Sequence, residues 1–275
     1  SSGPTNSIRG AGALSQVDSG IVIDVGGTTS DGGVLVNFFP RESTQAAQIG
    51  GVLTNFRMPD VVTIGIGGGT IVRFKEDKCQ LGPDSVGYLL KEKGISFGGF
   101  TLTLSDFFLA NDQLQIENIL EKNNLKERIQ VISGRNFQDA LELVKEQIQL
   151  SIEKLVDKLK TDPKEIPVIA CGGGAFLLPK KIAGASRVLF PEHLEVANAF
   201  GACIAQISSE DEKIVNTLQN DEKKELEKLL SNVKIELLKK GASEDSINVL
   251  TKESIPLAYL PGAVKLKVKL CGDLI

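Results

Sequence analysis

The chain has 275 residues, of which 41% are apolar and 24% are charged, and its formal net charge at pH 7 is −4. This composition is ordinary for a folded protein of one large or two small domains, and the absence of a basic surplus argues against a nucleic-acid partner. No apolar run approaches the roughly 20 residues that a membrane-spanning helix needs, so no membrane association is expected.

The cysteines show neither CxxC nor Cys/His spacing, which argues against structural zinc or a disulfide framework. They are Cys79, Cys171, Cys203 and Cys271. Residues 1–4 have neither the charged nor the apolar region of a signal peptide. We therefore expect a cytoplasmic protein with reduced thiols. Because the sequence does not begin with Met, we expect a chain that is processed or cut from a longer one.

Residues 1–20 are small and polar, and they predict either an ordered loop with a short helix or a frayed end. Two β-branched runs follow, Ile21 to Val25 and Val34 to Val36, with glycines and polar residues between them. Strand composition bounded by glycines predicts a β-hairpin here rather than a strand that leads into a helix.

The turn of this hairpin has the residues that a nucleoside triphosphate and its Mg²⁺ need. Gly26 and Gly27 lack a Cβ atom, so their amide groups can approach an anion closely. The hydroxyls of Thr28, Thr29 and Ser30 add donors, and a carboxylate flanks the turn on each side. These two carboxylates belong to Asp24 and Asp31. The alternative interpretation is a plain glycine turn with solvated polar residues.

A second segment repeats the order of strand, glycine turn and strand. The apolar run 61–66 leads into Gly67, Gly68 and Gly69, and the run 71–74 follows. We expect these glycines to double the number of backbone donors that a polyanion can use. A purely structural turn is the alternative.

Helical segments follow in the middle of the chain. Ser105 is expected to cap a helix that begins at Asp106, and the charged stretch 117–130 predicts a solvated helix. The clearest helix is predicted over residues 136–160 and ends at Asp162-Pro163, with a stripe of apolar residues that packs in the core. The stripe consists of Phe137, Ala140, Leu141, Val144, Ile148, Ile152, Leu155, Val156 and Leu159.

A third glycine segment follows a buried strand over residues 166–170. Gly172, Gly173, Gly174 and Ala175 leave room for a ribose or nucleobase to lie flat against the backbone. The segment is not GxGxxG, and GxxxxGK[ST] is absent from the sequence, so neither the dinucleotide fingerprint nor a Walker-type loop is present.

The rest of the chain contains fewer candidate functional residues. A short strand over 188–191 precedes a small-residue helix over 192–202, where His193 either contacts substrate or phosphate or is a hydrogen-bonded structural histidine. Residues 208–240 predict an amphipathic helix. Residues 263–270 alternate strictly, which predicts a strand with one buried face and a lysine edge.

The glycine turns, the aspartate pair and the GGGA segment resemble the superfamily of sugar kinases, heat-shock chaperones and actin. More specifically, the chain is similar to the hydantoinase A/5-oxoprolinase family over nearly its whole length. The segments that carry this resemblance are 2–11, 24–31, 50–51, 55–60, 64–69, 82–87, 97–99, 171–175, 195–199 and 255–262.

The resemblance implies an α/β fold of the ribonuclease-H-like actin/chaperone ATPase type, with a mixed sheet and flanking helices. It implies an ATPase-type domain with inserted helices over 1–206, and a helical and strand extension over 207–275 that packs on the same domain. It further implies ATP- and Mg²⁺-dependent opening of a cyclic amide such as a hydantoin or 5-oxoproline. Other members of the family carboxylate ketones.

Carried over to this chain, the resemblance assigns roles to the glycine segments and the carboxylates. The hairpin residues Gly26, Gly27, Thr28 and Thr29 would hold the β- and γ-phosphates, with Gly67, Gly68 and Gly69 beside them. Asp24 and Asp31 would bind Mg²⁺ or orient the nucleophile. The adenosine would lie on Gly172, Gly173, Gly174 and Ala175.

The chain departs from the family pattern in three places. It begins where the second domain of the family would begin, so we expect the N-terminal domain of the same protein to complete the site. Phe100 stands after Gly98-Gly99, where the family often has aspartate. Gly32-Gly33 replaces a branched residue after Asp31, which is expected to loosen the outgoing strand.

Three functions compete on this evidence. The first is the ATP-binding second half of a cyclic-amide hydrolase, in which a second hydantoinase-type subunit or a homo-oligomer is a further partner. The others are a non-catalytic nucleotide-binding or regulatory module and a scaffold that keeps only the fold. A subunit of an ATP-dependent ketone carboxylase is a further alternative.

Overall fold

The computed structural model describes residues 2–43, 47–49, 52–54, 58–76, 78–114, 116–117, 119–258 and 260–274. Gly50, Gly51, residues 55–57 and Tyr259, which contribute to the family-like segments, lie outside this part. The chain divides into two compact units, Ser1–Cys203 and Ile204–Ile275. The packing of the second unit on the first stays a prediction. Within the described residues, no helix is long and apolar enough to cross a membrane.

The first unit is built around a six-stranded mixed sheet, with strand order β10-β9-β1-β2-β3 and β6 paired to β2. The β1–β9 and β9–β10 pairs are parallel, and all pairs that β2 makes are antiparallel. The strands are β1 (Gly20–Val25), β2 (Ser30–Val36), β3 (Phe39–Pro40), β6 (Val61–Ile64), β9 (Ile166–Cys171) and β10 (Ala185–Leu189). The predicted hairpin and the predicted α/β class are confirmed.

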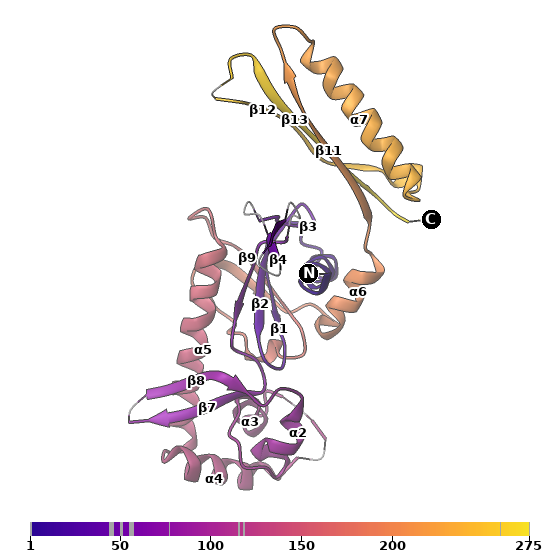
Figure 1. Ribbon diagram of the computed structural model, residues 1–275. Helices are drawn as coiled ribbons and strands as arrows, with labels where there is room; N and C mark the ends of the chain where they lie inside the picture. Colours follow the sequence, from indigo (N-terminus) through magenta and orange to yellow (C-terminus); the bar gives the residue numbers. More distant parts are fainter. Residues whose placement is uncertain are drawn as a thin grey trace. The chain divides into compact units, whose positions relative to one another are not determined.

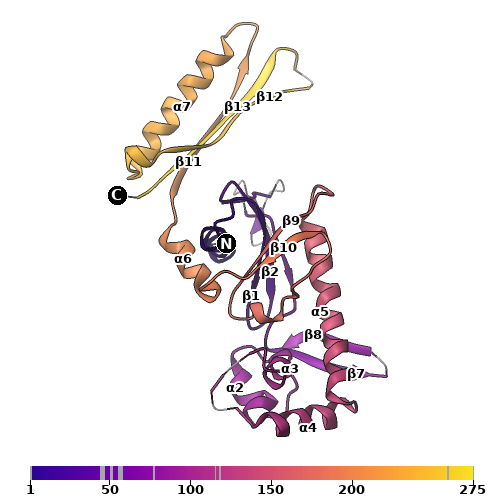
Figure 2. The ribbon, with the colours of Figure 1, turned by 180° about the vertical axis from the view of Figure 1, so that it is seen from behind.

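Helices cover both faces of this sheet (Figures 1 and 2). On one face lie α1 (Ser2–Ser15) and α6 (Ala197–Cys203), and on the other lies α5 (Phe137–Leu159). Ile8 of α1 is buried in one core cluster, whereas the apolar stripe of α5 is buried in another. The N-terminal segment is therefore a regular helix and not a frayed end.

Gly32 and Gly33 of β2 let these helices approach the sheet closely. A Cβ atom at Gly32 would lie 2.7 Å from Leu159 Cδ1 of α5, and one at Gly33 would overlap Ile8 Cδ1 of α1. We predicted that this pair loosens the strand. The structure instead shows both residues buried and paired with β1 and β6.

The helix predicted over residues 136–160 is confirmed as α5. Asn136 caps it by accepting a hydrogen bond from the Asp139 amide at 2.9 Å, and the helix ends at Leu159, before Asp162-Pro163. All nine residues of the predicted apolar stripe are buried. The spacing of apolar residues was sufficient to predict this helix, because a long helix that packs one face on a sheet needs apolar residues along that face.

Several short elements are inserted between β6 and α5. They are β7 (Thr70–Lys75), β8 (Lys78–Ser85), η1 (Gly87–Leu89), α2 (Leu90–Lys93), η2 (Ile95–Phe97), α3 (Leu104–Ala110) and α4 (Lys122–Ser133). A separate pair of short strands consists of β4 (Ala47–Ile49) and β5 (Val52–Thr54). Because β7 pairs with β8 and not with β6, the second glycine segment connects two sheets and is not a hairpin turn.

Two predicted helices in this insertion need correction. The N-cap of α3 is Thr103, which forms a reciprocal capping box with Asp106, so Ser105 does not cap this helix. The second is α4, which begins at Lys122 and buries Leu125 and Ile129 completely. It is therefore an amphipathic helix with a core-facing side rather than a solvated one.

The predicted elements around His193 form as shorter pieces. The third glycine segment leads into η3 (Ala175–Leu177), and the helix predicted over 192–202 is split into η4 (Leu194–Val196) and α6.

The second unit is a three-stranded antiparallel sheet in the order β11-β13-β12, with helix α7 packed on it. Its elements are β11 (Ile207–Asn216), α7 (Glu222–Lys239), η5 (Glu244–Ser246), β12 (Asn248–Pro256) and β13 (Ala263–Gly272). The alternation predicted for 263–270 is confirmed, because Val264, Leu266, Val268 and Leu270 are buried. The predicted lysine edge is wrong, since β13 is the central strand.

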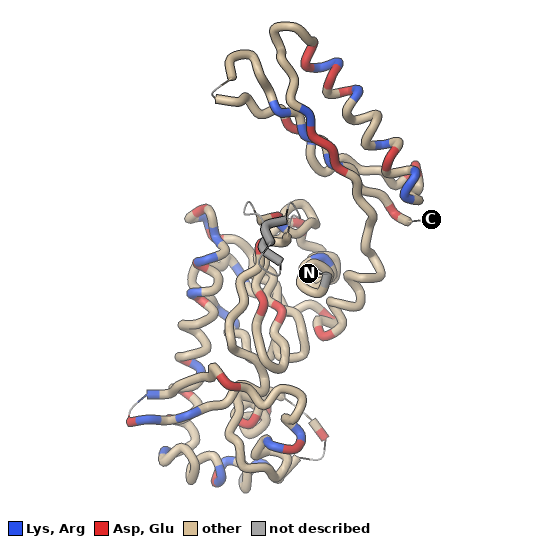
Figure 3. The backbone as a smooth tube through the Cα atoms, in the orientation of Figure 1, with Lys and Arg blue, Asp and Glu red and all other residues tan. Residues whose placement is uncertain are grey.

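Residues 207–216 form a strand where the sequence predicted the beginning of a helix. Acidic and basic residues follow one another along β11 and α7 (Figure 3). Glu212 of β11 pairs with Lys265 of β13 at 2.8 Å, and Glu210 pairs with Lys269 at 3.8 Å. These cross-strand pairs stabilise a strand whose composition alone favours neither state.

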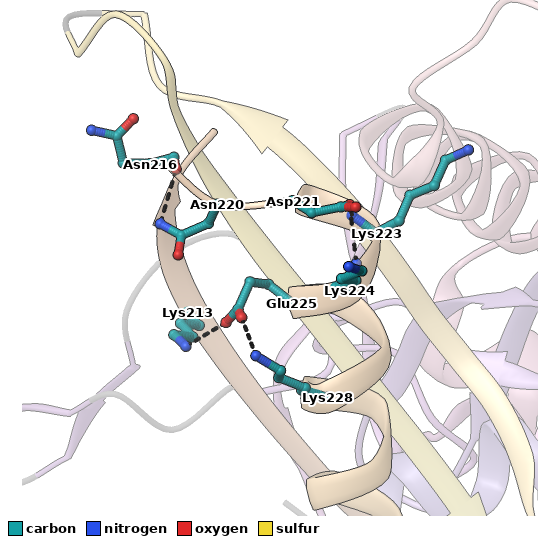
Figure 4. A network of polar contacts seen from close by, with 8 residues as sticks. All are labelled: Lys213, Asn216, Asn220, Asp221, Lys223, Lys224, Glu225 and Lys228. Carbon is teal, nitrogen blue, oxygen red and sulfur yellow. Dashed lines mark hydrogen bonds and ion pairs between the residues drawn. The ribbon is translucent and has the colours of Figure 1, made fainter. Parts of the chain in front are cut away.

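Glu225 links α7 to β11 (Figure 4). Its carboxylate accepts hydrogen bonds from Lys213 and Lys228, each at 2.7 Å. The hydrogen bond from Lys213, followed by that from Lys228, lowers the pKa of Glu225 from 4.5 to about 2. Because the pKa is lower in the folded state, the charged carboxylate stabilises the fold above its ordinary pKa. This contribution disappears as the pH falls from about 4.5 toward 2.

We therefore expect Glu225→Gln to lower the thermal unfolding midpoint at about pH 7 and to have little effect near pH 2. The measurement is thermal unfolding by circular dichroism across this pH range. Glu227→Gln, on the exposed side of α7, is the matched control and should leave the pH profile unchanged. An equal loss of stability at both ends of the range would contradict the assigned ion pairs.

Candidate functional site

The three glycine segments meet at the carboxyl end of β1. The Gly174 amide donates to the Val25 carbonyl at 2.8 Å, which joins the third segment to the strand end. The Gly68 amide donates to the Gly26 carbonyl at 3.1 Å, which joins the second segment to the hairpin turn. Segments separated by more than a hundred residues in sequence therefore form one local site.

Three amide groups of the hairpin turn make no hydrogen bond within the described residues. The Gly26 amide closes the turn by donating to the Thr29 carbonyl at 2.9 Å. For the amides of Gly27, Thr28 and Thr29, no acceptor exists among the described residues. A Cβ atom added at Gly27 would meet nothing within 4 Å. Adjacent free amides of this kind form a concave donor surface for an anion.

The second glycine segment holds this turn in place by hydrogen bonds. The amides of Gly68 and Gly69 donate to the carbonyls of Gly26 and Gly27, and the Gly67 amide donates to Thr70 Oγ1 at 2.8 Å. The extra donors that we predicted from Gly67, Gly68 and Gly69 are therefore not available in this conformation. A Cβ atom at Gly67 would lie 2.6 Å from the Thr28 amide nitrogen, so glycine is needed for this close contact.

Ser105 connects the second glycine segment to α3. Its amide and its hydroxyl both donate to the Gly68 carbonyl at 2.9 Å. Asp106 is completely buried and accepts hydrogen bonds from Ser96 and Thr103, with four donor atoms in total. This network fixes the position of Gly68, so the residue predicted as a helix cap instead braces the site.

The third glycine segment lies against the end of β1. Gly172 has a φ of +85°, and a Cβ atom there would lie 2.5 Å from the Val25 carbonyl oxygen and would overlap Asp24 Oδ1. A Cβ atom at Gly174 would lie 2.8 Å from the Gly26 carbonyl oxygen. Gly173, in contrast, is exposed and has open space in front of it.

A cavity of about 470 Å³ begins directly after this segment. It is lined by Phe176, Leu177, Leu178 and Pro179, and by side chains from α3, α5 and Phe190. Phe176 packs against Phe108 with a ring-centroid distance of 5.5 Å. A larger cleft of about 730 Å³ lies between the β7–β8 hairpin and α5, and none of the predicted site residues lines it.

Asp24 and Asp31 lie on the same face of the sheet. They are directly opposite each other in the β1–β2 pair, which places both side chains on one side. Asp24 Oδ2 accepts from Ser7 Oγ and Asp31 Oδ1 accepts from Thr63 Oγ1, both at 2.5 Å. Neither carboxylate pairs with a cationic side chain within the described ranges. Mg²⁺ is typically held by one or two carboxylates together with substrate phosphates, which these two residues fit.

The described residues hold no group of three or more His, Cys, Asp or Glu side chains placed to bind a metal. Cys171 is opposite Asp24 in the β1–β9 pair. Burial, followed by the negative charge of Asp24, raises the pKa of its thiol, and burial raises that of Cys79 to about 11. These two thiols are therefore protonated and unreactive near neutral pH.

Sequence reasoning missed several residues at this site. Ser85 Oγ donates to the Gly27 carbonyl at 3.4 Å, and Gly87, with a φ of +54°, lies beside Thr28. Both belong to the family-like segment 82–87, which was the available signal for them. Ser7 lies in the family-like segment 2–11, but its contact with Asp24 and that of Thr63 with Asp31 were not predictable, because the partners are far away in sequence.

His193 and Phe100, which the sequence analysis named, are both exposed. His193 is exposed, has a φ of +60°, and its side chain makes no hydrogen bond within the described residues. Its contact with a substrate stays a prediction. Phe100, in the position where the family often has aspartate, is 90% exposed.

Two solved structures resemble the chain over almost its whole length. One is a nucleotide-free acetone carboxylase, from work on ATP-dependent acetone carboxylation, with 18% identity and a TM-score of 0.67 over 99% of this chain. The other is an ATP-dependent caprolactamase from Pseudomonas jessenii, with 18% identity and a TM-score of 0.75 over 98% of this chain. The match covers 49% of each of those chains, so the present chain spans about half their length.

The mixed sheet with helices on both faces is an α/β fold, and the chain shares this fold with these two solved structures. A family model described as hydantoinase/oxoprolinase matches residues 1–211. The chain belongs to the hydantoinase/oxoprolinase family. No curated protein matches it.

Proposed function

We propose that this chain is the second nucleotide-binding half of an ATP-dependent amidohydrolase that opens a cyclic amide of the hydantoin or 5-oxoproline type. The observation that carries the proposal is the meeting of the glycine segments beside two carboxylates that have no cationic partner among the residues that the structure describes. Free amides at Gly27 and Thr28 suit the β- and γ-phosphates, and Asp24 and Asp31 suit the accompanying Mg²⁺.

The cavity behind the third glycine segment, which apolar side chains line together with Gln113, Lys145, Gln149 and Lys180, suits the nucleobase. Gly173 leaves the approach open, and Phe176 offers an aromatic side chain in the cavity wall. We infer that the ribose lies over Gly172, Gly173 and Gly174 and that the base enters the cavity. The 470 Å³ volume is in the range of small-molecule sites, which supports this placement.

ATP would transfer its γ-phosphoryl group to the amide oxygen, which releases ADP and makes the amide carbon electrophilic enough for water to attack. The ring C–N bond would then break with the nitrogen taking a proton, and a second water molecule would hydrolyse the resulting acyl phosphate to release inorganic phosphate. The residues of this chain would bind and orient the phosphates, and Asp24 or Asp31 would position Mg²⁺ or the attacking water. We propose that another domain provides the opposite wall of the site. The half-length match to both neighbours supports this division. A second subunit or a further copy of the chain is an additional proposed partner.

A ketone carboxylase subunit is the second candidate, because the acetone carboxylase structure shares this fold. In that case the same nucleotide half would serve a carboxylation. Phosphate release by the longer protein that contains this chain, measured separately with cyclic amides and with ketones plus bicarbonate, distinguishes the two. Absence of stimulation by either class, with ATP still bound, would favour a non-catalytic nucleotide module.

The direct test is calorimetric titration of the chain with ATP and ADP, with and without Mg²⁺. Gly27→Ala is expected to weaken Mg²⁺-dependent binding about tenfold, because its methyl group occupies open space at the turn, next to amides whose hydrogen bonds to a charged group would each contribute roughly 1.5–3 kcal/mol. Stability should not change, because the added Cβ meets no atom within 4 Å.

Gly65→Ala is the matched control. It adds a methyl group at an exposed glycine outside the hairpin, where the nearest atom is Pro83 O at 4.0 Å. Its affinity should equal that of the unmodified chain. The proposal fails if neither this chain nor the longer protein binds nucleotide, or if Gly27→Ala binds as tightly as the control.

A further inference from the structure

The Asp24 carboxylate is held by a hydroxyl from a different element. Ser7, in the middle of α1, is only 1% exposed, and its hydroxyl donates to Asp24 Oδ2 at 2.5 Å. Charge-assisted hydrogen bonds of this kind are shorter and stronger than neutral ones. The bond therefore fixes one of the two carboxylate oxygens.

Asn198 of α6 determines the direction of this hydrogen bond. Its side-chain nitrogen donates to Ser7 Oγ and to the Gly3 carbonyl, each at 2.9 Å. A carbonyl oxygen only accepts, so the atom that faces Gly3 is the nitrogen and not the amide oxygen. Ser7 thus accepts from Asn198, and its single proton is directed to Asp24.

The other oxygen of Asp24 faces the third glycine segment. A Cβ atom at Gly172 would overlap Oδ1, so the absence of a side chain there leaves room for this oxygen. Oδ1 accepts no hydrogen bond from the described residues. The two oxygens of one carboxylate therefore have different surroundings: Oδ2 is bound by Ser7, and Oδ1 is turned toward the glycine segment.

Close contact between the two helices holds the donors together. A Cβ atom at Gly10 of α1 would overlap the Ala197 carbonyl, and one at Gly201 of α6 would overlap the Asn6 carbonyl. The backbones of α1 and α6 are consequently as close as glycine permits. This contact sets the distance over which Asn198 reaches both Ser7 and Gly3.

We propose that Ser7 and Asn198 are positioning residues for Asp24, and that the chain of donors from Asn198 through Ser7 reserves Oδ1 for the Mg²⁺–nucleotide ligand. The assignment of the ligand rests on the proposed function. The positioning itself rests on the contacts within α1, α6 and β1. Outer partners that orient metal-binding carboxylates commonly change metal affinity by about 10- to 100-fold when they are removed.

The first test is a crystal structure of the Ser7→Ala variant beside that of the unmodified chain. Alanine suits the interior of α1, so the helix should persist. We expect a single Asp24 rotamer in the unmodified chain and a shifted or divided one in Ser7→Ala. Asn198→Asp, which keeps the shape but replaces the donating nitrogen, should displace Ser7 or Asp24. An unchanged Asp24 rotamer in both variants overturns the proposal.

The second test is calorimetry with ATP in the presence and absence of Mg²⁺. Ser7→Ala should weaken the Mg²⁺-dependent affinity about tenfold and leave the Mg²⁺-free affinity unchanged, a split that general loss of structure would not produce. Ser7→Thr, which retains the hydroxyl, should restore the Mg²⁺-dependent affinity. The control is Ser15→Ala, since Ser15 lies on the same helix and donates only to carbonyls within it.

The two tests separate the two claims. If the unmodified chain binds no nucleotide but Asp24 moves in Ser7→Ala, the positioning role stands and the nucleotide assignment fails for this chain. If Ser7→Ala lowers affinity equally with and without Mg²⁺, Ser7 has only a structural role and the inference is wrong.

Discussion

Replacing Asp31 with alanine is expected to reduce Mg²⁺-dependent ATP binding by about 10- to 100-fold, because one of two carboxylates that suit the cation is lost. Asp31 lies opposite Asp24 on the β1–β2 hairpin, and within the described residues its only hydrogen-bond donor is Thr63. Binding of ATP without Mg²⁺ should stay the same or improve slightly, since a negative charge near the phosphates disappears.

The measurement is calorimetric titration at fixed ionic strength, because salt screens exposed charges. Asp157→Ala is the control: it removes one exposed carboxylate from α5 and changes the net charge equally. In the longer protein, phosphate release stimulated by a cyclic amide should fall with the affinity. Unchanged binding and turnover in Asp31→Ala would show that this carboxylate has no part in the site.

Gly172→Ala is expected to destabilise the first unit by about 2–5 kcal/mol. The left-handed backbone at φ +85° costs a residue with a side chain about 1–2 kcal/mol, and overpacking adds about 1–3 kcal/mol. The added Cβ would overlap Asp24 Oδ1 and approach the Val25 carbonyl oxygen. Loss of nucleotide binding should accompany the loss of stability, because the third glycine segment and Asp24 move together.

Gly173→Ala is the matched comparison one residue later. Gly173 is exposed and has no atom within 4 Å of an added Cβ, so urea unfolding should give a free energy within about 0.5 kcal/mol of the unmodified chain. Its nucleotide affinity should still fall, since the methyl group enters the open space over the segment. Equal stability of the two variants would contradict the tight packing at Gly172.

Local patterns in the sequence predicted the elements whose stability comes from one buried face. The stripe of α5 and the alternation of β13 follow directly from the burial that each requires. The hairpin turn from Gly26 to Thr29 was predictable because glycines bound it. β11 was not, since its acidic and basic residues suit an exposed helix as well as a strand, and pairing with the distant β13 decides between them.

The site was predictable as a set of segments but not as a set of contacts. The glycines predicted that the backbone lies close to another group at these positions. The sequence alone could not say whether that group is a ligand or another turn. An added Cβ atom would meet open space at Gly27 and Gly173, whereas at Gly67 and Gly174 it would meet the backbone of the hairpin. The bond between Asn198 and Ser7 spans 191 residues and leaves no local signal.

The central position of β13 in the second unit affects how this sheet forms during protein synthesis and how it responds to proteolysis. Both β11 and β12 pair with β13, and β13 follows them in the chain. While the ribosome is still producing residues 263–272, the two earlier strands have no partner within this sheet and expose unpaired edges, which favours aggregation. Proteolysis within this last strand would likewise remove Leu266 and Val268 from the core and disassemble the whole sheet rather than shorten it.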